Sequence, residues 1–166
     1  MDTLKWSASH AVYVPEIDDE HKQIFEAVYN LRQAFAEGGA PAEIRRQTQR
    51  LISSIGEHFE HEERLMRAAR YGSMRWHKQA HQSARRRVGE FVLRIEQGES
   101  GAVLELAEYL TAWLHDHTRL TDRMLGAFLR NQQRCMWKMT FRAGTKAADE
   151  CTWVHASGET FDPKNP

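Results

Sequence analysis

Residues 58–81 carry the pattern that decides the fold. They begin His58-Phe59-Glu60-His61-Glu62 and end His77-Lys78-Gln79-Ala80-His81. His58 and Glu62 are four residues apart, as are His77 and His81, so each pair shares one face if both segments are helical. Two such pairs on neighbouring antiparallel helices converge on one point. Because imidazoles and carboxylates between bundle helices are typical metal ligands, the stretch predicts a metal site inside a helical bundle.

Composition restricts the classes of function. A chain of 166 residues suits one domain with a short appendage. Lys+Arg and Asp+Glu both number 23, so no basic excess favours nucleic acid or an anionic membrane. The sequence lacks the apolar run of a signal peptide and has no apolar segment long enough to span a bilayer. The two cysteines, Cys135 and Cys151, form no motif, so a cytoplasmic location is expected.

Apolar residues recur every three or four positions in four segments, which predicts four amphipathic helices. Asp18 or Asp19 is expected to help begin the first helix. Interruptions at 37–41, 71–73 and 97–101 contain glycine, and the first also contains proline, which is accepted in a first helical turn. The predicted core-facing positions are Ile17, His21, Ile24, Val28, Leu31 and Phe35; Ile44, Thr48, Leu51, Ile55, His58, Glu62 and Leu65; Met74, His77, His81, Ala84, Val88, Phe91 and Ile95; and Val103, Leu106, Leu110, Trp113, His117, Leu120, Met124 and Phe128.

The short turns predict an all-α, up-down-up-down antiparallel four-helix bundle over residues 17–130. Residues 1–16 show no helical period and are expected to form an extended N-terminal arm. Residues 131–166 form a C-terminal extension. Within it, Cys135–Phe141 alternates in polarity and is followed by glycine and proline, so a hairpin or irregular segment is expected there.

Histidines stand out on the predicted core-facing stripes. One inward histidine is more often a hydrogen-bonded core residue than a ligand, but five unpaired imidazoles would each cost about 1–3 kcal/mol. Mutual hydrogen bonds could satisfy two or three of them, whereas a metal satisfies all five. The inward histidines are His21, His58, His77, His81 and His117. No role is assigned to His10, His61, His115 or His155.

Helical spacing selects one carboxylate and leaves the choice of a second one open. Glu62 lies on its stripe. Asp122 follows His117 by five residues, which is about 140° around a regular α-helix, so periodicity does not prefer Asp122 to Asp116.

Over residues 6–129 the sequence resembles the hemerythrins, particularly the single-domain bacterial ones. Each pair is weak alone, but seven positions in order on four helices form a specific pattern. The matching pieces are Trp6 with Ile17–Lys22, His58-Phe59-x-x-Glu62-Glu63, His77-x-x-x-His81 and Trp113-Leu114-x-x-His117-x-x-x-x-Asp122.

The resemblance implies a non-haem di-iron centre with an oxo or hydroxo bridge between two iron ions. By analogy, His77, His81 and His117 would hold one iron, and His21 and His58 the other. Glu62 and Asp122 would bridge the pair. This ligand set leaves one coordination position open on the iron with two histidines, and in the family that position binds dioxygen.

The resemblance also implies an apolar pocket beside the open position, lined by Ile24, Phe59, Trp113, Leu114 and Thr118. Two residues depart from the family pattern. Thr118 stands where a bulky aliphatic residue is usual, and Ala84 stands where phenylalanine is frequent. Our hypothesis is that they enlarge the pocket, make it slightly polar and shorten the lifetime of bound oxygen.

Reversible oxygen binding for carriage, storage or delivery is the expected function, with no catalytic residue assigned. A sensor of oxygen, nitric oxide or redox state is an alternative in which the extension is the output, although the chain shows no signalling domain. A peroxidase or nitric-oxide-reducing enzyme is a third alternative, which a larger pocket would favour. Imidazole sites also accept zinc and copper, so the metal itself is open, and no protein partner is indicated.

Overall fold

The computed structural model describes residues 5–99, 101–142, 153–154 and 160–161. Helices dominate the described residues, as predicted. In chain order they are a short 3₁₀ turn η1 (Ala8–His10), α1 (Pro15–Ala36), α2 (Pro41–Ala68), α3 (Met74–Glu96), α4 (Ala102–His117), a π-helical turn η2 (Thr118–Asp122) and α5 (Arg123–Arg142). None of these helices has the length and hydropathy needed to cross a membrane, as far as the described residues go.

The turns between helices use the residues that the sequence pattern singled out. Pro41 occupies the first turn of α2, and Gly38 before it has a φ of +73°, which glycine adopts without steric cost. Gly98, just after α3, has a φ of +77°. At the start of α1 the carboxylate of Asp18 accepts hydrogen bonds from the backbone amides of Val12 and Tyr13, so it fastens the preceding segment to the helix.

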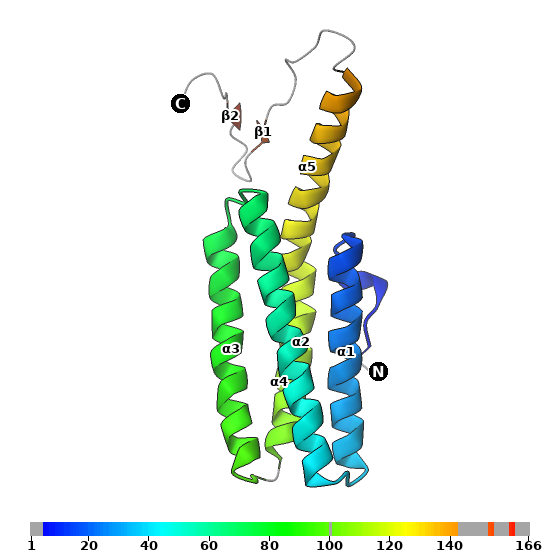
Figure 1. Ribbon diagram of the computed structural model, residues 1–166, viewed down its shortest axis with the longest axis vertical. Helices are drawn as coiled ribbons and strands as arrows, with labels where there is room; N and C mark the ends of the chain where they lie inside the picture. Colours follow the sequence, from blue (N-terminus) through cyan, green and yellow to red (C-terminus); the bar gives the residue numbers. More distant parts are fainter. Residues whose placement is uncertain (1–4, 100, 143–152, 155–159, 162–166) are drawn as a thin grey trace. The chain divides into compact units, whose positions relative to one another are not determined.

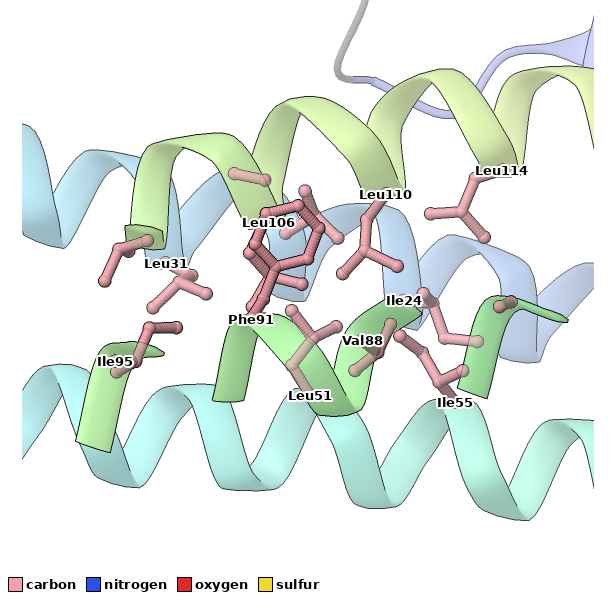
Figure 2. Packing of buried hydrophobic residues seen from close by; sticks show 14 of the residues in the cluster. Ile24, Leu31, Leu51, Ile55, Val88, Phe91, Ile95, Leu106, Leu110 and Leu114 are labelled. Carbon is pink, nitrogen blue, oxygen red and sulfur yellow. The ribbon is translucent and has the colours of Figure 1, made fainter. Parts of the chain in front are cut away.

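Four helices form an antiparallel bundle in which α1 and α3 each pack against both α2 and α4 (Figure 1). The main apolar core contains side chains from all four helices. Figure 2 shows Leu31, Leu51, Phe91 and Leu106 meeting between them. A second, smaller apolar cluster contains Val12, Ile17, Met66, Tyr71 and Leu125. The all-α four-helix bundle prediction is therefore confirmed.

The fourth helix contains the main departure from the expected pattern. α4 continues directly into the π turn η2 and then into α5. A π turn adds one residue to a helical turn, so it rotates everything after it relative to a regular helix. Leu120 and Met124, predicted to face the core, are 58% and 41% exposed, whereas Leu125 is fully buried. Those two predictions were wrong because they assumed an unbroken α-helical period.

The C-terminal extension also differs from expectation. The chain divides into two compact units, residues 1–129 and 130–166. Residues 135–141, expected to be a hairpin or irregular, belong to α5, which runs to Arg142. Two short strands, β1 (Trp153–Val154) and β2 (Thr160–Phe161), pair antiparallel, with Trp153 opposite Phe161. The rest of the extension, including Cys151 and His155, lies outside the described residues.

Candidate metal centre

Seven buried polar side chains gather in the layer between the two apolar clusters. Along α1, for example, Ile17 belongs to the smaller cluster, His21 to the polar layer and Ile24 to the main core. All four long helical runs contribute to this layer, and none of the seven residues is more than 5% exposed. They are His21 from α1, His58 and Glu62 from α2, His77 and His81 from α3, His117 from α4 and Asp122 from η2.

The seven residues form two overlapping groups of potential metal-binding atoms. Within each group the donor atoms all lie within 4.8 Å of one another. Glu62 and Asp122 belong to both groups, so two carboxylates stand between two sets of imidazoles. One group adds His77, His81 and His117 to these carboxylates, and the other adds His21 and His58.

Short distances confirm that the donor atoms converge. Nε2 of His77 lies 3.2 Å from Oε2 of Glu62 and 3.1 Å from Oδ1 of Asp122. Asp122 also approaches Nε2 of His117 at 3.0 Å and Nε2 of His21 at 3.2 Å. One carboxylate from η2 therefore touches histidines from three helices.

Although these atoms lie 3.0–3.2 Å apart, most of them form no hydrogen bond. Among the described residues, the buried atoms without one include Nε2 of His77, His81 and His117 and both carboxylate oxygens of Glu62 and Asp122. Leaving so many buried polar atoms unpaired is costly. A cation in contact with the imidazole nitrogens and carboxylate oxygens would satisfy them together. The donor set therefore fits a metal ion.

The electrostatics of the metal-free cluster agree with this fit. Burial and the charge of Asp122 would raise the pKa of Glu62, but His58, His77 and His81 lower that pKa to about 2. Burial would lower the pKa of His77, but the Asp122 and Glu62 carboxylates raise it to about 9. Burial would raise the pKa of Asp122, but His117, His21 and His77 hold it well below its ordinary value. Both carboxylates are therefore ionised at neutral pH, and their charge favours a cation among the imidazoles.

Two further glutamates orient the imidazoles and were given no role from the sequence. Glu20 accepts hydrogen bonds from Nδ1 of His58 at 2.8 Å and Nδ1 of His61 at 2.6 Å. An Nδ1–H bond of this kind leaves Nε2 of His58 free to face the cluster. The signal that could have revealed Glu20 is its position one residue before His21, on the flank of the same stripe.

Glu63 orients His81 in the way that Glu20 orients His58. It is 6% exposed, and its Oε1 lies 3.4 Å from Nδ1 of His81 and 3.2 Å from Nη1 of Arg85. Its second oxygen lies 3.1 Å from Nζ of Lys78. Glu63 therefore links a cluster histidine to two surface cations.

Aromatic rings cover the cluster on the side facing the main core. Phe59 stacks on His81 with ring centroids 4.0 Å apart, and Trp113 stacks on His117 at 4.1 Å. The Phe59 and Trp113 rings also meet each other edge-on at 5.3 Å. The other predicted pocket residues, Ile24, Leu114 and Thr118, are all fully or almost fully buried.

Histidines that were given no role from the sequence have structural surroundings of their own. His10 is buried, and its Nε2 lies 2.7 Å from Nδ1 of His115. This pair joins η1 to the end of α4. His61 contacts Glu20, as described above. Asp116, which spacing could not distinguish from Asp122, is exposed.

Comparisons with known proteins all match this chain to the hemerythrins. A family model described as the hemerythrin HHE cation binding domain matches residues 12–129. Bacteriohemerythrin from Pseudomonas aeruginosa is 34% identical over 122 residues, which cover 74% of this chain and 78% of that protein. Myohemerythrin-1 from Phascolopsis gouldii is 30% identical over 117 residues, covering 70% and 87% respectively.

Solved structures agree. A crystal structure of wild-type hemerythrin matches with a TM-score of 0.70 and 28% identity, covering 75% of this chain and 96% of that one. The matched range of the family model, residues 12–129, includes all seven clustered side chains. This chain therefore belongs to the hemerythrin family.

Proposed function

We propose that the protein is a non-haem di-iron protein that binds dioxygen reversibly. The observation that carries this proposal is the pair of overlapping donor groups that share Glu62 and Asp122. Two carboxylates, each with two oxygens, suit the bridging of two metal ions. In this assignment three histidines would hold one iron and two histidines would hold the other. The three-histidine set is His77, His81 and His117, and the two-histidine set is His21 and His58.

Two Fe(II) ions would supply the two electrons that dioxygen takes up on binding. The protein's own residues set the conditions for that chemistry. A site richer in histidine than in carboxylate differs from the glutamate-rich sites of other di-iron bundles. The stacked Phe59 and Trp113 rings keep bulk water from the imidazoles. Glu20 and Glu63 hold His58 and His81 with Nε2 facing inward.

The proposal is tested by metal analysis and visible spectroscopy of the purified protein. We expect about two irons per chain, because two donor groups share Glu62 and Asp122. After anaerobic reduction we expect a visible spectrum that depends on oxygen. That spectrum should disappear under argon and return with oxygen. A Glu62→Gln variant should lose iron, whereas Glu60→Gln, on the exposed face of the same helix, should not.

Other results would redirect the assignment. Zinc or copper at full occupancy, with no iron uptake, would contradict the di-iron proposal. Iron binding with immediate irreversible oxidation and steady turnover of peroxide would instead support an enzyme. Stopped-flow mixing of the reduced protein with oxygen distinguishes these outcomes.

A further inference from the structure

An apolar groove runs along the outer surface between α2 and α3, away from the metal cluster. Its volume is about 500 Å³, within the usual range for small-molecule sites. Ile52 and Ile55 line it from α2, and Val88, Val92 and Leu93 line it from α3. Leu93 is 59% exposed, so the groove presents apolar surface to solvent.

Two glycines are among the residues that line this groove. Gly56 and Gly89 lie inside α2 and α3, where glycine weakens a helix relative to alanine. A Cβ added to either glycine would meet no atom within 4 Å. Neither glycine is therefore required by close packing within the described chain. Their effect is to leave open space between the two helices.

The polar side chains of the lining are Arg85 and Gln49. Arg85 lies one helical turn after His81, at the end of the groove nearer the metal cluster, and Gln49 lies toward the other end. Gln49 precedes Gly56 by seven residues, so the groove extends about 10 Å along the helix. The lining contains a cation and no carboxylate.

Arg85 retains capacity for an anion. Its side chain is 38% exposed, and Nη1 lies 3.2 Å from Oε1 of Glu63. Glu63 is shared with Lys78, so one carboxylate faces two cations. The remaining guanidinium N–H groups can therefore donate to a second anion while the contact with Glu63 persists.

We propose that this groove binds a medium-chain fatty-acid anion, with its hydrocarbon chain over Gly56 and Gly89 and its carboxylate on Arg85. The apolar walls fit the chain, and the single cation at one end fits the head group. A cationic or strongly polar ligand is disfavoured, because the lining offers it no carboxylate.

Isothermal titration of decanoate and neutral 1-decanol into the purified, iron-loaded protein tests this proposal. We expect saturable binding of one decanoate per chain. Gly89→Leu adds a bulky side chain to the lining of the groove and should weaken binding of both compounds at least tenfold. Arg85→Gln should weaken decanoate about tenfold and leave 1-decanol unchanged. Gln23→Leu adds the same side chain to the exposed surface of α1 and should bind like the wild type.

Several outcomes would overturn the proposal. These are the absence of saturable decanoate binding to the wild type, unchanged binding by Gly89→Leu, or equal weakening of both compounds by Arg85→Gln. If the wild type is instead a dimer that Gly89→Leu converts to a monomer in gel filtration, the groove is an interface between two copies. Circular dichroism and iron content check that each variant is folded and loaded.

Discussion

Glu20 holds two histidines at once, and this makes it the residue outside the donor cluster whose loss should matter most. A glutamine at this position offers one acceptor oxygen where two Nδ1 atoms now donate. Glu20→Gln should therefore lower metal affinity roughly ten- to a hundredfold, since His58 loses its orienting partner. Competition with a chelator at fixed pH measures this loss. Glu60→Gln serves as the control, and equal metal retention by both variants would remove Glu20 from the site.

Thr118 is the pocket residue that departs from the family pattern. It is fully buried, and its hydroxyl donates to the backbone oxygen of His115 at 3.5 Å. Thr118→Ile replaces that hydroxyl with an apolar branch, so water should reach the site less readily. The oxygen-dependent spectrum should then decay several-fold more slowly in air. Thr111→Ile, a matched change about two turns earlier on α4, should leave the decay rate unchanged. Equal decay rates for the Thr118 variant and the wild type would contradict the hypothesis.

Periodicity located the inward histidines and Glu62 because each lies on the apolar stripe of its own helix. It missed Glu20 and Glu63 for a physical reason. Both act across helix boundaries: Glu20 from α1 on α2, and Glu63 from α2 on α3. The position of Glu20 beside His21 marks it as a candidate, but spacing within one helix does not show which histidine of another helix a glutamate contacts. The family resemblance, not the spacing, preferred Asp122 to Asp116, and burial of Asp122 agrees with that preference.

At the scale of elements, the π turn η2 explains why helical spacing did not identify Asp122 or the buried positions after it. His117 and Asp122 are five residues apart, a separation that a π turn places on one face and an α turn does not. Beyond it, Leu125 is buried where a regular helix would bury Met124. The continuation of α5 through 135–141 has a simpler cause. No glycine or proline occurs between Ala127 and Ala143, so nothing in that stretch stops the helix.

Deletion of Leu120, which is exposed, tests the role of this turn. The deletion would place His117 and Asp122 four residues apart, so the buried positions His117, Asp122 and Leu125 would then be separated by four and three residues, a regular α-helical spacing. We expect unchanged helical content by circular dichroism. Iron content should fall by more than half, because Asp122 is drawn toward His117 by about 1.5 Å of helical rise. Full iron occupancy would show that the donor geometry does not need the π turn.

At the scale of the whole molecule, the cluster should make the stability of the metal-free protein depend on pH. The pKa of His77 is raised to about 9, so its contribution is complete below about pH 6.5 and is lost as pH rises through 9. The pKa of Glu62 is lowered to about 2, so its contribution is complete above about pH 4.5 and is lost as pH falls toward 2.

The free energy of unfolding of the metal-free protein should therefore be highest between about pH 4.5 and 6.5. By pH 9.5 it should have fallen by up to about 3 kcal/mol through His77. Urea unfolding at several pH values measures this. Metal binding should show the opposite trend, because a metal must displace the His77 proton, so affinity should rise with pH up to about 9. A flat stability profile across pH 5–9.5 would contradict the predicted coupling.

Residues 1–129 form one of the two compact units of the chain. All seven donors and both apolar clusters lie within the unit that ends at residue 129. A chain ending at Arg134 should therefore keep the iron content, the oxygen-dependent spectrum and the melting temperature of the full chain. A chain ending at Gly126 lacks Phe128 and Leu129, which pack on the smaller apolar cluster, and should melt at a lower temperature. If the chain ending at Arg134 loses iron or reversible oxygen binding, residues 135–166 support the centre directly. That result would favour the alternative function of a sensor with the extension as its output.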